Sequence, residues 1–128
     1  MKHLVLSPKT VEQTAADLQI AIKNNGFGVL HSLDLQQTLA GKGVALANKC
    51  LIFDVCNPHK AADVLAVDMA MNLALPCRMS VYSDNNQTYI GMISPKAMLA
   101  LLSDAPALAT AAAEVENTLL TIMHEASQ

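Results

Sequence analysis

Two short segments carry the side chains of this sequence that are best suited to chemistry. The first is Cys56-Asn57-Pro58-His59, and the second is Pro76-Cys77-Arg78. Asparagine before proline is typical of a helix start, because the amide caps the helix and proline presets the first helical φ angle. A thiol beside the unpaired amides of a helix N-terminus is stabilised as thiolate. We therefore expect Cys56 to end a strand, next to that helix, with a lowered pKa.

Alternatives exist for both cysteines. Free cysteine is often a small buried hydrophobic residue, so Cys56 could simply pack. If a strand-helix-strand return brings Cys77 near Cys56, the two sulfurs could form a redox pair, or bind zinc or copper(I) together with His59. Cys56-x-x-His59 has no second close-spaced ligand pair, so we predict no metal site and leave the cofactor unknown.

Arg78 is the only arginine of the chain. Its planar guanidinium suits a carboxylate or a phosphate, whereas an edge-strand salt bridge is the plainer interpretation. Together, the two segments predict a ligand-binding site formed by Cys56, Asn57, Pro76, Cys77 and Arg78.

The elements that must position these residues follow from capping signals and hydrophobic periodicity. The pattern predicts helices over 9–25, about 58–69, 95–102 and from after Asp104 to about 125. Short β-branched or aromatic stretches predict strands over His3–Leu6, Gly28–Leu33, Lys49–Cys56, Arg78–Ser83 and Thr88–Ile93, the last two as a hairpin. Residues 35–46 fit a short helix and a loop. The prediction is a single α+β domain over 1–128, with an antiparallel sheet packed against helices.

Composition excludes several classes of protein. The chain has 128 residues, of which 52% are hydrophobic and 15% charged, with a net charge of −3. Disorder is thereby excluded, and a nucleic-acid partner is disfavoured by the acidic balance and by only 3% aromatic residues. Charged residues interrupt the apolar stretches, so we expect no membrane span. The apolar N-terminal stretch ends at Ser7-Pro8, too early for a signal peptide, and three cysteines do not suggest a disulfide scaffold. We expect a cytoplasmic protein with reduced thiols.

Four segments together resemble one known family. They are Asn25-Gly26-Phe27-Gly28-Val29-Leu30, Cys56-Asn57-Pro58-x-x-Ala61, Leu75-Pro76-Cys77-Arg78-x-x-Val81-Tyr82 and Pro95-x-x-Met98-Leu99. In order and spacing they are similar to the family called domain of unknown function 302, from about residue 5 to residue 125. The resemblance implies a TATA-binding-protein-like β-α-β(4)-α architecture and a homodimer. It brings no established activity, and architecture alone does not imply DNA binding.

Three functional hypotheses follow. The first is a homodimeric module that binds a small ligand or a partner thiol at the five-residue site. The second is a thiol-disulfide or sulfur-transfer enzyme that uses Cys56, with Cys77 as the resolving thiol. The third is a purely structural or assembly module whose apolar surplus is buried in a dimer interface. Whether the protein is an enzyme is left open.

Overall fold

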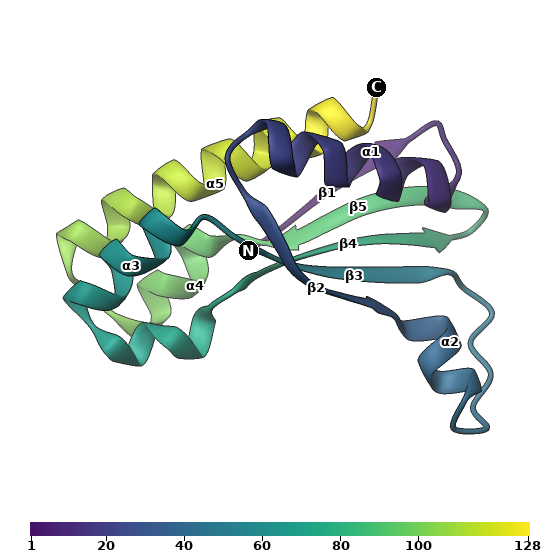
Figure 1. The fold of residues 1–128 in the computed structure, drawn as a ribbon, viewed down its shortest axis with the longest axis horizontal. Helices are drawn as coiled ribbons and strands as arrows, with labels where there is room; N and C mark the ends of the chain where they lie inside the picture. The colour runs from purple at the N-terminus through teal and green to yellow at the C-terminus, as the bar shows by residue number, and fades with distance from the viewer.

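The computed structural model describes residues 1–128 and contains one five-stranded antiparallel sheet (Figure 1). Its strands are β1 (Lys2–Ser7), β2 (Gly28–Asp34), β3 (Cys50–Cys56), β4 (Cys77–Asp84) and β5 (Gln87–Ile93). They lie in the order β1-β5-β4-β3-β2, and every neighbouring pair is antiparallel. The predicted hairpin is confirmed as β4 and β5, joined by Asn85 and Asn86 with φ angles of 51° and 62°. Asparagine tolerates this left-handed conformation in tight hairpin turns.

Six helices accompany the sheet. They are α1 (Val11–Asn24), α2 (Leu35–Ala40), α3 (Pro58–Val67), the 3₁₀ helix η1 (Met69–Ala74), α4 (Pro95–Leu102) and α5 (Pro106–Ala126). The long helices α1 and α5 cover one face of the sheet, α3 and α4 lie at one end of the molecule, and α2 projects at the other (Figure 1). The α+β prediction is therefore confirmed. None of the helices is long and apolar enough to cross a bilayer.

Side-chain caps set the helix starts. Thr10 Oγ1 accepts from Gln13 N at 3.1 Å, and Ser94 Oγ accepts from Ala97 N at 3.0 Å. The helix predicted over 58–69 ends at Val67, because Asp68 is extended and its carboxylate accepts from Ala70 N at 2.9 Å. Asp68 thus ends α3 and caps η1, a helix that was not predicted.

Two apolar clusters form the core. The larger lies between the sheet and helices α1 and α5, with Val55 and Met79 of the sheet and Leu18 and Leu119 of the helices all 0% exposed. The smaller is built by α3, η1, α4 and α5 around five residues: Val64, Met71, Leu99, Leu108 and Ala112. The strand ends and loops that join the two clusters include the segments on which the predicted site depends.

Candidate functional site

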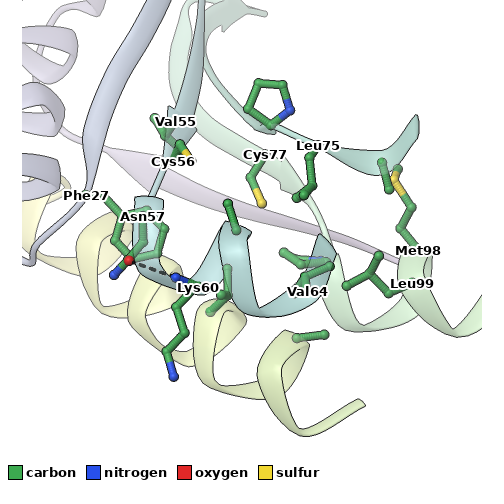
Figure 2. Close-up of a pocket in the computed structure, with 16 residues that line it drawn as sticks. Phe27, Val55, Cys56, Asn57, Lys60, Val64, Leu75, Cys77, Met98 and Leu99 are labelled. Carbon is green, nitrogen blue, oxygen red and sulfur yellow. Dashed lines mark hydrogen bonds between the residues drawn. The ribbon is translucent and has the colours of Figure 1, made fainter. Parts of the chain in front are cut away.

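Four of the five predicted site residues line one cavity, between the two apolar clusters (Figure 2). Cys56 is the last residue of β3, and Asn57 caps α3. Pro76 and Cys77 lead into β4, whose first residue, Cys77, lies opposite Val55 of β3. The antiparallel pairing of β3 and β4 therefore brings together two segments that the helices α3 and η1 separate in the sequence.

The cavity is mostly apolar. It contains about 510 Å³ of space without protein atoms, including its open mouth, and 12 of its 16 lining residues are hydrophobic. The other residues that line it are Phe27, Val55, Lys60, Ala61, Val64, Ala74, Leu75, Pro95, Met98, Leu99, Ala112 and Val115. A concave apolar site with a few polar groups is the usual form of a small-molecule site.

The two thiols are held in their neutral form. Burial raises the pKa of the Cys56 thiol. Burial, with a smaller contribution from the charge on Cys56, raises the pKa of Cys77 from its ordinary 9.0 to about 11. The expectation of a lowered pKa at Cys56 is therefore wrong. Asn57 Oδ1 accepts from His59 N and Lys60 N, both at 3.1 Å, so its carboxamide occupies the first amides of α3.

Lys60 is the one charged residue that lines the cavity. Its ammonium forms an ion pair with Glu114 of α5, and this hydrogen bond raises the pKa of the lysine. Figure 2 shows the side chain extending away from Cys56 and Cys77. Lys60 therefore contributes its aliphatic stem to the cavity, while its charge links α3 to α5.

Arg78 does not line this cavity. Successive residues of a strand point to opposite faces, so Arg78 lies on the sheet face opposite Cys77 and Met79. There it lines a separate hollow with Lys2, Ser80 and Gly91. The five predicted residues thus divide into four at the cavity and one on the other face.

The structure gives no geometry for a metal ion. No group of three or more histidine, cysteine, aspartate or glutamate side chains is placed to hold one. His59 is exposed on the first turn of α3 and is not among the residues that line the cavity.

Sequence reasoning missed the contributions of Phe27, helix α4 and helix α5. Phe27 lies in the first of the four segments that carry the family resemblance, and Pro95, Met98 and Leu99 lie in the fourth. Each of the four segments therefore supplies residues to the same cavity. Membership of Phe27, Pro95, Met98 and Leu99 in these segments was the sequence signal that could have assigned them to the site.

Comparisons with known proteins identify the family and the fold. The family model described as "Domain of unknown function DUF302" matches residues 3–126. A solved structure, the crystal structure of an uncharacterized conserved DUF302 protein from Bacillus stearothermophilus, is similar with a TM-score of 0.93 and 31% sequence identity. The match covers 98% of this chain and 97% of that chain. No curated protein matches.

Proposed function

This chain belongs to the family of domain of unknown function 302, and we propose that it is a binding module for a small apolar molecule. One observation carries the proposal: the four segments of the family resemblance all line one apolar cavity. Cys56, Asn57, Pro76 and Cys77 are its proposed ligand-binding residues. The module takes up residues 1–128 as one domain.

The chemistry of the lining supports a neutral, apolar ligand. Transferring apolar surface from water into such a cavity is favourable by about 25 cal/mol per Å². Carrying a charged group in is costly, because Lys60 is already paired with Glu114 and no other charged side chain lines the cavity. Protonated Cys56 and Cys77 act as soft, polarisable contacts.

The proposal is tested by filling the cavity from α3. Ala61 lines the cavity, whereas the next residue, Ala62, is exposed. We expect indole, a neutral bicyclic probe, to bind the wild type and Ala62→Leu equally in isothermal titration. Ala61→Leu should weaken binding by about tenfold or more, since added side-chain atoms occupy the ligand's space. Equal affinity of Ala61→Leu and Ala62→Leu would reject the site.

We also propose that two copies form a homodimer, as the family resemblance implies. The support is apolar surface at the end of the molecule formed by η1 and α4. Leu73, Leu101 and Met69 are 80%, 74% and 65% exposed, the highest values among the large hydrophobic residues. Apolar patches of this kind are typical of association sites. Sedimentation should show a dimer at micromolar concentration that Leu73→Lys weakens and Ile20→Lys, changed on α1, does not.

Thiol-disulfide exchange is a second candidate function, favoured by the placement of Cys56 and Cys77 at one cavity. The two thiols would give two electrons and two protons to a disulfide substrate, form a Cys56–Cys77 bond and release two substrate thiols. Incubation with oxidised glutathione should then remove two hydrogens from the intact mass, and Cys77→Ser should leave a mixed disulfide on Cys56. An unchanged mass would reject this candidate.

The free state of all three cysteines supports a cytoplasmic location.

A further inference from the structure

The sheet face opposite α1 and α5 carries a second hollow, which is lined by a larger share of polar and charged residues than the apolar cavity. We call this the outer face. Pairing across the strands places Leu4 of β1, Gly91 of β5, Ser80 of β4 and Ile52 of β3 in one row on it. Leu4 is 47% exposed, so no helix covers it. The outer face therefore presents a mixed apolar and polar surface around Gly91.

Gly91 forms part of the hollow. A Cβ atom at this position would lie 3.1 Å from Leu4 Cδ2, 3.5 Å from Tyr82 Cε1 and 3.6 Å from Ser80 Oγ. Glycine within a strand often marks a place where another group approaches the backbone closely, and here the approaching groups are the Leu4, Tyr82 and Ser80 side chains, which the missing Cβ allows to lie over the strand. The hollow beside it contains about 460 Å³ of space, including the part open to solvent. Leu4 and Tyr82 line it as apolar walls, and Ser80 adds a hydroxyl group.

Two unpaired cations lie at the same hollow. Lys2 and Arg78 both line it, and neither is among the side chains that form ion pairs within 4.0 Å. Asp54 is the cross-strand neighbour of Arg78, but no carboxylate oxygen of Asp54 forms an ion pair with the guanidinium within 4.0 Å. In a chain with net charge −3, two cations without a carboxylate partner form a local positive site.

We propose that this hollow binds a small carboxylic acid with an apolar ring. The guanidinium of Arg78 matches a carboxylate through two parallel hydrogen bonds, and the ammonium of Lys2 adds a second positive charge. The ring lies against Leu4 and the Tyr82 side chain, where an aromatic contact is favourable. Two cations are too few for the phosphate backbone of a nucleic acid, so the charge fits a single small anion. The site is independent of the apolar cavity and of the function proposed for it.

Titration with 2-naphthoate, followed by amide NMR shifts, tests the proposal on the whole chain. We expect saturable binding with the largest shifts in β4 and β5 near Gly91. The neutral analogue 2-naphthamide should bind at least tenfold more weakly, because it has no charge for Arg78 and Lys2. Arg78→Gln should cost about tenfold in affinity, Arg78→Lys less because it keeps the charge, and Lys2→Gln less because a lysine is a single flexible point charge. Lys96→Gln, an exposed cation on α4, is the matched control and should change nothing.

Four outcomes would overturn the site. The first is equal binding of 2-naphthoate and 2-naphthamide, and the second is unchanged binding by Arg78→Gln. The third is an outer face that a second copy of the chain already covers. In that case the amide shifts in β4 and β5 would depend on protein concentration without ligand, and 2-naphthoate would not displace the second copy. Shifts around Ala61 and Met98 alone would assign the probe to the apolar cavity and would equally reject this hollow.

Discussion

Cys77 should react far more slowly in the folded protein than in the unfolded chain. Burial raises the pKa of this thiol from 9.0 to about 11, and only the thiolate is nucleophilic. At pH 8 an ordinary thiol is about 9% ionised, whereas a thiol of pKa about 11 is about 0.1% ionised, a loss of roughly 100-fold. The more basic thiolate is intrinsically more reactive and recovers up to roughly tenfold of this. The expected rate at pH 8 is therefore roughly 10- to 100-fold lower, before any steric shielding.

The assay is alkylation with iodoacetamide across a pH series, followed by peptide mapping that separates Cys50, Cys56 and Cys77. The same protein unfolded in urea supplies the reference rate for each cysteine. We expect the rate of Cys77 to rise with pH toward a midpoint near 11 in the folded protein, and near 9 in urea. A folded-state midpoint at or below 9 would refute the argument that an apolar cavity holds this thiol neutral.

Three further changes have defined outcomes. Between pH 9 and 11 the unfolded chain loses the Cys77 proton while the folded protein keeps it, so the free energy of unfolding should fall by up to about 3 kcal/mol as the pH rises. In urea titrations Cys77→Ala should reduce this dependence of the free energy of unfolding on pH. An unchanged dependence would contradict the raised pKa of Cys77. Asn57→Ala removes the acceptor of two α3 amides and should lower the free energy of unfolding by about 1 kcal/mol. Asn57→Asp keeps an acceptor oxygen and should lower it less. Equal losses of stability in the two variants would exclude the helix cap as the cause. Leu119 is 0% exposed, so Leu119→Ala should lower the free energy of unfolding by about 2–5 kcal/mol in the same titrations. Ile20 is 59% exposed, so Ile20→Ala should lower it by less than about 1 kcal/mol. Similar losses of stability in the two variants would contradict the described core.

Local signals allowed much of the fold to be predicted. The Asn57-Pro58 and Ser94-Pro95 pairs each specify a cap and a first helical residue within a few positions, and both helices begin at the proline. The boundary at Asp68 was missed, although aspartate is also a capping residue. A helical hydrophobic pattern that continues into Met69 does not reveal that Asp68 will be extended and start a new 3₁₀ helix.

The site was harder to predict because it depends on contacts between distant segments. Cys56 and Cys77 are adjacent to strand and helix boundaries that the sequence marks clearly. The cavity that both thiols line is completed by residues of α4 and α5, which lie about 20 to 60 positions away in the sequence. Alternation along β4 could have separated Arg78 from Cys77, since Met79 and Val81 are both apolar and mark the buried face. Arg78 follows Cys77 directly in the sequence, and this proximity led to both being assigned to one site.

Contact between a bound apolar molecule and Met98 tests the central proposal most directly. Met98 lines the cavity, and its methyl group gives a single resolvable signal in protein labelled with [¹³C-methyl]methionine. Met69 is 65% exposed and serves as the internal control. We expect nuclear Overhauser effects between indole protons and the Met98 methyl in the wild type and in Ala62→Leu, none to Met69, and their loss in Ala61→Leu. Binding of indole without contact to Met98, or contact that Ala61→Leu leaves intact, would contradict a ligand site between the two apolar clusters.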